Sequence, residues 1–405
     1  MNIALRMSPP LVPTRDLPGG ALARIDVFDD VDSAAPAWDE LATADSVASP
    51  YQSREWVRLW QSHVLPRSGG HLLILVGRDA TGAPLFVWPL VRGRLGPLRI
   101  AAFVGGKHAT INMPLWRRDV AQAWTASDLH DVLRSIAARV PDLDLIILCN
   151  QPFAWHGTAN PFALLPHFRA TEDNFVAPLG LPGAQVVERE ISSAMRSRLR
   201  NKERKLSKLP GYRYVRAQTP DAVRAQLDAF FAQKSAKLAA MGVQNVFAGP
   251  GIEDFVRAAC LDGLGEGRAL IELHALEADG EILALFSGIN DGRRFTSNFN
   301  SHTMSEHARF SPGLILMQYM IANVADRGFE SFDIGPGEAH YKSFFCKTLE
   351  PLFDSVIPLS PRGRLIAWPL RLTLAAKSAI KRNSVLWAIA SRVRRVLRPT
   401  QAPTS

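Results

Sequence analysis

The sequence predicts an α/β (α+β) protein made of two similar units, each a mixed sheet flanked by helices. Apolar residues make up 47% of the 405 residues, which is enough for a large core. Helical and strand-like periodicities alternate along the chain, and the order of elements in the first half recurs in the second. The longest apolar run, Leu314–Ala325, is shorter than the roughly 18 residues of a membrane span and is typical of a core helix.

The first half predicts a helix, a hairpin, a third strand, a crossover helix, a fourth strand and a last helix and strand. Ala-Thr-Gly separates two apolar runs and is the hairpin signal. The predicted elements are a helix over 51–66, a hairpin over 71–91, strands over 98–106, 143–150 and 175–179, and helices over 120–138 and 160–168.

The second half repeats this order after a very basic helix over 194–208. Ala-Asp-Gly forms the corresponding hairpin signal. We expect helices over 221–242 and 252–263, a hairpin over 269–290, a strand over 293–300, a helix from 313, a strand over 329–335 and a helix over 338–345.

The net charge of +9 is concentrated at one end of the chain. Residues 361–405 contain no acidic residue, so residues 1–360 are close to neutral, and we expect no DNA-binding face on the fold. Three widely spaced cysteines, Cys149, Cys260 and Cys346, predict neither a disulfide framework nor a metal cluster. The cations of the tail are Arg362, Arg364, Arg371, Lys377, Lys381, Arg382, Arg392, Arg394, Arg395 and Arg398.

These patterns divide the chain into four segments. Residues 1–22 are rich in proline and glycine, lack the long apolar stretch of a secretory signal and predict a flexible lead-in. Residues 23–190 and 191–360 are the two predicted units, and 361–405 is a basic amphipathic tail.

Four stretches resemble one protein family. They are PYQSREWVRLWQSH (50–63), RSRLRNKERKL (196–206), FFAQKSAKLAAMG (230–242) and RFSPGLILMQYMIANVADRGFESFDIGPGEAHYKSFF (309–345). Together they resemble the CelD-type acetyltransferase-like family of the GNAT superfamily, over roughly residues 50–358. That family is associated with bacterial cellulose and exopolysaccharide synthesis and is related to FemAB-type aminoacyltransferases, which have a duplicated GNAT fold.

The resemblance implies an acyltransferase that moves an acyl group, acetyl by expectation, from acyl-CoA to an amine or hydroxyl of a polysaccharide or cell-envelope precursor. No metal is implied. Two alternatives remain open: a FemAB-like transfer from aminoacyl-tRNA, and a non-catalytic GNAT scaffold that serves polysaccharide synthesis. The oligomeric state is left undetermined.

The resemblance places the donor at the start of the helix from 313. Unpaired amides and the helix dipole favour an anion there, and Ser311, Gly313 and Leu314 form this turn. Arg309 could add a charge-assisted contact to phosphate. The pattern R-x-x-x-G departs from the usual R-x-x-G-x-G/A, and a glycine that merely packs against a strand is the other interpretation.

The resemblance also suggests the catalytic groups. Tyr341 lies where GNAT enzymes often carry the tyrosine that protonates the thiolate leaving group. Glu338 or Asp333 would be the base, and Lys342 would bind a charged group of the acceptor. The structural alternatives are complementing the helix dipole for Glu338, capping for Asp333 and packing for Tyr341.

Other polar residues are candidates for binding the acceptor. Asn300 and His302 follow the third strand of the second unit and are candidate acceptor contacts, although an ordinary turn would also explain them. His302 and His307, with Glu306 nearby, could suggest a metal site, but no third ligand has a suitable spacing. The stripe Arg196, Arg200, Arg204 is either a solvated face or a contact to a phosphate-bearing acceptor or anionic lipid.

The tail mixes tryptophan and leucine with cations only, which is typical of helices that lie on anionic membranes. We therefore expect a cytoplasmic protein that docks peripherally on the inner face of the cell membrane through 361–405. Packing of the tail onto the body, or disorder, is the alternative.

Overall fold

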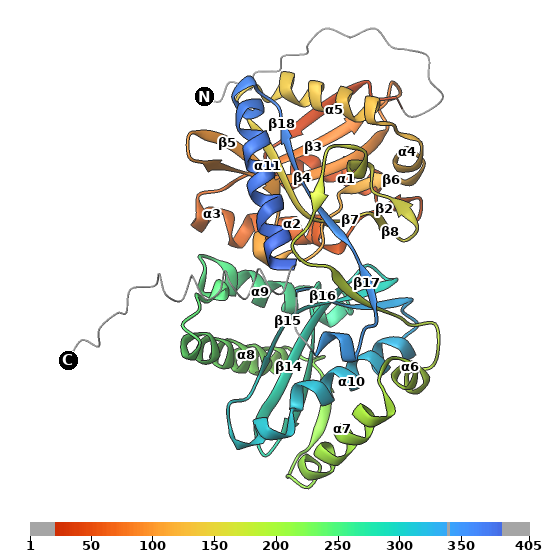
Figure 1. Ribbon diagram of the computed structural model, residues 1–405, viewed down its shortest axis with the longest axis vertical. Helices are drawn as coiled ribbons and strands as arrows, with labels where there is room; N and C mark the ends of the chain where they lie inside the picture. Colours follow the sequence, from red (N-terminus) through yellow and green to blue (C-terminus); the bar gives the residue numbers. More distant parts are fainter. Residues whose placement is uncertain (1–20, 338–340, 383–405) are drawn as a thin grey trace, which may run out of the picture.

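The computed structural model describes residues 21–337 and 341–382. Two α/β units are stacked along the long axis of the molecule, and each consists of a mixed sheet with helices on its faces (Figure 1). The predicted fold class is confirmed. Most of the lead-in expected over 1–22, and residues 383–405 of the tail, lie outside the described residues.

The first sheet has the order β1-β3-β4-β5-β7-β18-β10. Neighbouring strands are antiparallel except for β5 and β7, which are parallel. A short ribbon of β2 and β6 joins at β4. The bounds are β1 Arg24–Phe28, β2 Ser46–Val47, β3 His71–Arg78, β4 Pro84–Leu95, β5 Leu98–Phe103, β6 Leu115–Arg117, β7 Leu145–Pro152, β10 Phe168–Arg169 and β18 Leu352–Pro358.

The second sheet repeats this topology. Its order is β12-β13-β14-β15-β16-β11-β17, and only β15 and β16, again the fourth and fifth strands, are parallel. The predicted duplication is therefore visible strand by strand. The bounds are β11 Asn174–Pro178, β12 Arg213–Arg216, β13 Glu272–Ala278, β14 Glu281–Asn290, β15 Arg294–His302, β16 Ser331–Pro336 and β17 Thr348–Glu350, and β8 Ala154–Trp155 pairs with β9 Thr158–Ala159 outside both sheets.

The two units exchange their sixth strand. β11 comes from the first half of the chain but pairs with β16, and β18 comes from the second half but pairs with β7. Sheet membership therefore does not follow the expected boundaries at 190/191 and 360/361. Periodicity along the sequence reports which residues form a strand but not which sheet the strand joins.

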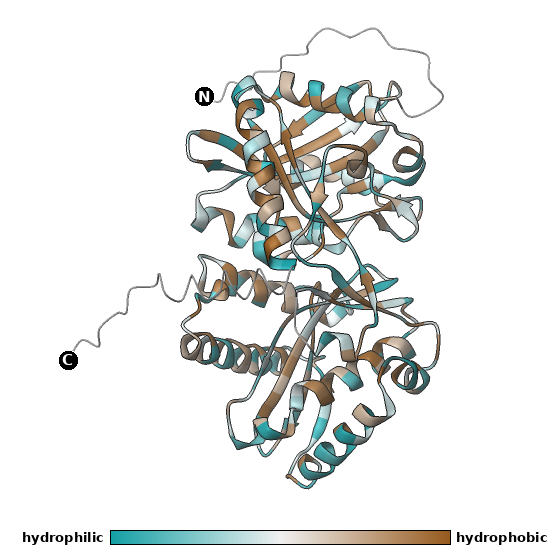
Figure 2. Ribbon diagram, in the orientation of Figure 1, coloured by the Kyte–Doolittle hydropathy of each residue, from teal (hydrophilic) through white to brown (hydrophobic). Residues whose placement is uncertain are grey.

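The hairpins follow from local turn chemistry. Asp279 and Gly280, between β13 and β14, both have positive φ (55° and 71°), as a two-residue type I′ turn requires. The central strands are apolar along nearly their whole length and covered on both faces (Figure 2).

Five predicted helices are present to within a few residues, the helix predicted over 120–138 is divided into two, and the helices over 31–41 and 183–190 have no counterpart in the prediction. Those of the first unit are α1 Val31–Leu41, α2 Arg54–His63, α3 Leu65–Ser68, α4 Arg118–Ala123 and α5 Ala126–Arg139. The second unit contains α6 Gly183–Glu190, α7 Ser193–Leu206, α8 Pro220–Ala240, α9 Ile252–Leu261 and α10 Pro312–Asp326. Short 3₁₀ turns are η1 Pro50–Gln52, η2 Gly106–His108, η3 Pro161–Leu164, η4 Val246–Ala248, η5 Leu264–Glu266, η6 Glu306–Phe310 and η7 Lys342–Phe344.

The units meet through α2 and α9. Phe255 packs edge-on against Trp56 and Trp60, with ring centroids 4.8 and 5.1 Å apart, inside one buried cluster that spans both units. Gly251 (φ 73°) starts α9, and a Cβ there would lie 1.9 Å from the His63 carbonyl oxygen. This close approach fixes how the second unit packs against the first unit.

Two predicted helices are corrected. The helix predicted over 160–168 is the 3₁₀ turn η3 followed by β10. The helix predicted over 338–345 is, in its described part, the single 3₁₀ turn η7. Residues 338–340 lie outside the described residues, so a shared helical face for Glu338 and Tyr341 has no support from the described chain.

The described part of the tail is the helix α11 (Pro361–Arg382), which packs on the first sheet (Figure 1). Gly363, Ala367 and Ser378 are buried, and Ser378 Oγ donates to the carbonyl oxygens of Arg169 and Ala170 at 3.0 and 3.1 Å. No helix within 21–337 or 341–382 combines the length and hydrophobicity needed to cross a bilayer.

Candidate functional site

The parallel strands β15 and β16 separate at their carboxyl ends. Their pairing covers only three residues of each strand and ends at Thr296 and Asp333. β15 continues to His302 beside β14, whereas β16 ends at Pro336. Carboxyl ends of parallel strands are where sites collect in α/β folds, and this opening is the place to look for one.

A cavity of about 320 Å³ lies beside this opening. It is bounded by the segment from the end of β15 to the start of α10 and by Tyr341 after β16, with Lys237 of α8 and Phe286 of β14 completing the lining. Six residues predicted for the site line it: Asn300, His302, Ser311, Gly313, Leu314 and Tyr341. The other lining residues are Lys237, Phe286, Ser301, Ala308 and Pro312.

The start of α10 is strained and uncapped. Ser311 occupies the N-cap position, but its backbone is left-handed (φ 55°, ψ 52°), and its side chain does not accept from the first amides. A capping serine normally has extended backbone geometry. Ser311 therefore does not cap α10 with its side chain. Instead, Ser311 Oγ accepts from Lys202 Nζ at 2.6 Å, and the first turn of α10 contains no acidic residue. Strain of this kind is often kept at functional sites.

Gly313 is not required by the packing of the described residues. A Cβ there would meet only Phe286, at an ordinary contact distance of 3.9 Å. Gly313 is also absent from the residues with positive φ. The alternative that Gly313 packs tightly against a strand is thus not supported, and its small size leaves the backbone amide accessible from the cavity.

Three lysines contact or line the cavity wall, and none of them forms an ion pair with a carboxylate of the described chain. Lys202 comes from α7, and Lys234 and Lys237 come from α8. Burial lowers the pKa of all three, and no carboxylate among the described residues lies close enough to oppose this. Lys234 Nζ donates to the Asn300 carbonyl oxygen at 3.0 Å, and Lys237 Nζ lies 3.1 Å from His302 Nε2. Partly buried cations that form no ion pair with a carboxylate favour binding of an anion.

Tyr341 and His302 are both neutral at pH 7. Burial raises the pKa of Tyr341, although a side-chain hydrogen bond with Asn300 opposes this shift. Burial, together with the charges of Lys237 and Lys234, lowers the pKa of His302. The cavity therefore presents a phenol that keeps its proton and an imidazole that lacks a charge.

Asp333 and Lys342 lie beside the cavity but do not line it. Asp333 is fully buried, and its carboxylate accepts from Thr296 Oγ1 at 2.9 Å and from the Gly335 amide at 3.1 Å. Burial raises the pKa of Asp333 to about 6, and the nearby Arg294 guanidinium opposes the shift. Lys342 Nζ donates to the carbonyls of Gly335 and Pro336 at 3.0 and 2.8 Å, and burial lowers its pKa to about 8.

Two further predicted residues are not brought into the cavity. The exposed side chain of Arg309 pairs with Glu306 at 3.2 Å and covers the Phe310 ring at 4.8 Å, so it does not line the cavity. Glu338 lies outside the described residues.

The lysines are what sequence reasoning missed. Lys234 and Lys237 belong to FFAQKSAKLAAMG, and their i, i+3 spacing places both on one face of α8. Lys202 lies in the basic helix α7, whose predicted stripe of Arg196, Arg200 and Arg204 omitted it. The sequence shows the i, i+3 spacing of Lys234 and Lys237, but it does not show that they contact Asn300 and His302.

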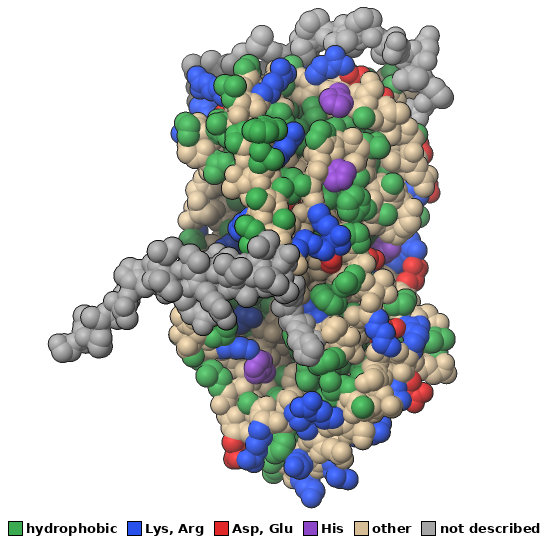
Figure 3. Space-filling view, in the orientation of Figure 1, with side chains coloured by type: hydrophobic (Ala, Val, Ile, Leu, Met, Phe, Trp, Pro, Cys, Tyr) green, Lys and Arg blue, Asp and Glu red, His purple; other side chains and the backbone are tan. Residues whose placement is uncertain are grey.

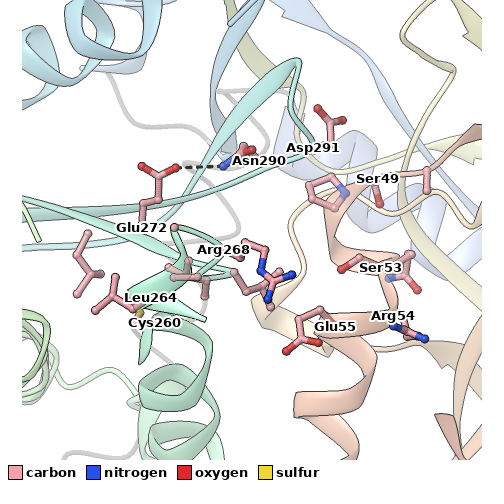
Figure 4. Close-up of a pocket in the computed structure, with 18 of the residues that line it drawn as sticks. Ser49, Ser53, Arg54, Glu55, Cys260, Leu264, Arg268, Glu272, Asn290 and Asp291 are labelled. Carbon is pink, nitrogen blue, oxygen red and sulfur yellow. Dashed lines mark hydrogen bonds between the residues drawn. The ribbon is translucent and has the colours of Figure 1, made fainter. Parts of the chain in front are cut away.

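A larger cavity of about 830 Å³ lies between the two units (Figure 4). Ser49, Ser53, Arg54 and Glu55 of the first unit face Leu264, Arg268 and Glu272 of the second (Figure 4). Its charged groups are already paired: Arg54 with Asp39 at 2.7 Å, and Glu272 with Arg327 at 2.8 Å. None of the predicted site residues lines it.

Within the described parts of the chain, no group of three or more His, Cys, Asp or Glu side chains is arranged to hold a metal ion.

Comparisons with known proteins agree with this geometry. Residues 193–343 match the family described as "Acetyltransferase (GNAT) domain". That range contains every strand of the second sheet except β11 and β17, and also the whole lining of the smaller cavity. No curated protein matches the chain by sequence.

Among solved structures, FemX superposes with a TM-score of 0.56 at 11% identity, covering 84% of this chain and 100% of FemX. A conserved protein of unknown function from Bacteroides thetaiotaomicron gives 0.47 at 14% identity, covering 82% of this chain and 99% of that protein. A tandem GNAT protein from the clavulanic acid biosynthesis pathway gives 0.44 at 11% identity, covering 84% and 99%. The GNAT match and the FemX superposition agree with the duplicated topology: the chain has a GNAT-type acyltransferase fold.

Proposed function

We propose that the protein is an acyltransferase that moves an acyl group, acetyl by preference, from coenzyme A to an amine or hydroxyl of a polysaccharide or cell-envelope precursor. The observation that carries the proposal is the cavity at the start of α10, where an uncapped helix start and uncompensated lysines meet. Both features favour the pyrophosphate of a coenzyme A donor.

The donor is held by the backbone amide of Gly313 and by lysine side chains. The Leu314 amide is already used, because it donates to the Ser311 carbonyl oxygen at 3.0 Å. The first amides of a helix have no partner within the helix and point toward its N-terminal side. Lys202 and Lys237 reach this turn from two other helices and supply positive charge to the phosphates. Arg309 is paired with Glu306 and is assigned no contact in this arrangement.

The acid is Tyr341. The acceptor nitrogen or oxygen attacks the thioester carbonyl carbon, the carbon–sulfur bond breaks, and the thiolate takes a proton from the tyrosine hydroxyl. Because burial raises its pKa, Tyr341 is protonated at neutral pH and able to donate. A base must remove the proton of the acceptor, and we assign this role to Glu338.

Asp333 and Lys342 are proposed to position the site. Asp333 holds the Gly335 amide, and Lys342 holds the Gly335 and Pro336 carbonyls, so both fix the turn that leads to Tyr341. Their side chains are occupied, which argues against direct contact with substrate.

The acceptor class rests on the resemblance of 50–358 to the CelD-type family. Asn300 and His302 line the cavity beside Tyr341 and are the proposed acceptor contacts. An acceptor that is a precursor of envelope or extracellular polymers also fits an enzyme that works in the cytoplasm at a membrane surface.

Calorimetry with acetyl-CoA and free coenzyme A tests the proposal. Wild type should bind both, Gly313→Ala should weaken binding about tenfold, because a Cβ would stand between donor and amide, and Gly313→Glu should abolish it. The matched control is Gly93→Ala in β4, where a Cβ would also meet one side chain, Ile100, at 3.9 Å. Absence of coenzyme A binding by wild type refutes the proposal, and acyl transfer that depends on charged tRNA would favour the aminoacyl alternative.

A further inference from the structure

The helix α11 has two apolar faces. One face packs on the first sheet, where Arg371 Nε also donates to the Val356 carbonyl oxygen at 2.9 Å. On the opposite face, Leu365, Trp368 and Leu372 are 77%, 67% and 49% exposed. Their spacing of i, i+3 and i+7 forms one stripe along the helix. Exposed apolar stripes of this kind mark interaction surfaces.

The flanks of this stripe are positively charged. Within 361–382 the helix has six lysine and arginine residues and no acidic residue. Lys381 and Arg382 pair with Glu172 and Asp173, whereas Arg362 and Arg364 are exposed beside the upper part of the stripe. In the space-filling view, hydrophobic side chains gather over the first unit where α11 runs, with lysine and arginine side chains around them (Figure 3).

We propose that the outer face of α11 docks on an anionic lipid bilayer, with Leu365, Trp368 and Leu372 inserted at the level of the headgroups. A tryptophan among leucines flanked by cations and free of acids matches the chemistry of such a surface. A protein partner recognised by this face would need an equally apolar strip with acidic edges. An anionic membrane supplies both over any length of helix, and the exposed Arg362 and Arg364 add to the attraction.

The docking surface is rigid because α11 is anchored to the sheet. Ser378, Ala367 and Gly363 fix its inner face, and a Cβ at Gly363 would lie 2.0 Å from the Asp144 carbonyl oxygen. The first unit therefore carries the membrane contact, while the second unit carries the cavity. This division goes beyond the proposed acyl transfer and does not depend on it.

Co-sedimentation of the full chain with vesicles tests the inference. Vesicles of phosphatidylcholine alone and of phosphatidylcholine mixed with phosphatidylglycerol are compared at low salt. Wild type should bind only the mixed vesicles, and Leu365→Ser/Trp368→Ser should bind them about tenfold more weakly or worse. The control is Met241→Ser/Val243→Ser, which removes two apolar side chains of similar exposure, 61% and 50%, from the second unit.

A second measurement isolates the tryptophan. Brominated acyl chains should quench part of the fluorescence of wild type, and this part should be lost in Trp368→Phe while binding is kept. Equal binding of the double variant and wild type, or equal binding to both vesicle types, would overturn the inference. So would a dimer of wild type in gel filtration that the double variant abolishes, because a second copy would then cover the face.

Discussion

The crossover helices α5 and α10 occupy the same place in the two sheets but begin differently. Each crosses between the fourth and fifth strands. At the start of α5 the Asp128 carboxylate accepts from Thr125 N at 2.8 Å and Thr125 Oγ1 at 2.7 Å. At the start of α10 no acid is present and Ser311 caps nothing. One helix start is closed by a carboxylate of its own first turn, and the other has neither an acidic residue in its first turn nor a side-chain cap.

The parallel strand pairs differ in the same direction. The third pair of β5 and β7 is Ala102 and Ile147, whereas the third pair of β15 and β16 is Thr296 and Asp333. Beyond the pairing of β5 and β7, the backbone and side chain of Asn112 donate to the carbonyls of Asn150 and Cys149. The chain itself thus covers β7, where the second unit has its cavity.

The two units of this duplicated fold thus differ at the start of the crossover helix and at the end of the parallel strand pair. In the first unit, residues of the same unit form hydrogen bonds with the helix start and with the end of β7. In the second unit the helix start has no side-chain cap, and Lys202, Lys234 and Lys237 near the cavity form no ion pair with a carboxylate of the described chain. Six substitutions sharpen or break this comparison.

The largest effect is expected from Tyr341→Phe. Without the proton donor, turnover of acetyl-CoA with an amino-sugar probe such as glucosamine should fall about 10²–10⁴-fold, while coenzyme A affinity stays unchanged. Thiol release measures the first and calorimetry the second. Tyr319→Phe is the control, because that hydroxyl donates to Glu203 outside the cavity. An unaltered rate would leave only a packing role for Tyr341.

Asp333→Asn should change the pH dependence of stability. The folded pKa of about 6 lies above the ordinary 3.8, so the protonated form is favoured by folding. This contribution is present below pH 3.8 and is lost as the pH rises through 6. Relative to the variant, wild type should therefore lose about 1–3 kcal/mol of unfolding free energy between pH 4 and pH 7.

Asp144→Asn in the first unit gives the opposite sign. A hydrogen bond from Ser360 and one from the Arg99 amide lower the pKa of Asp144. Its contribution is present above the ordinary pKa and is lost as the pH falls. Urea unfolding at several pH values distinguishes the two slopes, and parallel curves for both variants would contradict the assignment.

Lys237→Met should weaken coenzyme A binding about tenfold and reduce the salt dependence of binding, since one charge-assisted contact is lost. The same change should not lower the melting temperature, because it removes a partly buried cation that no acid compensates. Lys107→Met, an exposed lysine of the first unit, is the control. Unchanged affinity would mean that the lysines do not contact the donor.

The smallest effects concern the two helix starts. Asp128→Ala in α5 should cost about 1 kcal/mol of stability, because two hydrogen bonds at the helix start are lost. Ser311→Ala in α10 should cost less than this, since it removes the hydrogen bond from Lys202 but no cap of the helix. Calorimetric melting of both variants measures the difference, and equal losses would mean that α10 is capped after all.

The sequence was most informative where contacts are local. Turn residues such as Asp279-Gly280 and the apolar periodicity of α10 predicted element types, and their order predicted the duplication. The segment over 338–345 failed because its helical pattern is short, and Lys342 is instead tied to the turn behind it. The sequence did not predict the exchange of β11 and β18, because strand pairing depends on long-range contacts that no window of sequence contains.

By itself the sequence determined the elements, their repetition and the turn with Gly313 that lines the cavity, because spacing, turn chemistry and burial are properties of neighbours along the chain. Only the tertiary structure decided that Lys202 and Lys237 meet at that turn, that Arg309 is turned away, and that α11 shows an apolar face outward. These facts depend on which surfaces pack together, and packing brings together residues that are distant in sequence, such as Lys202 and Ser311.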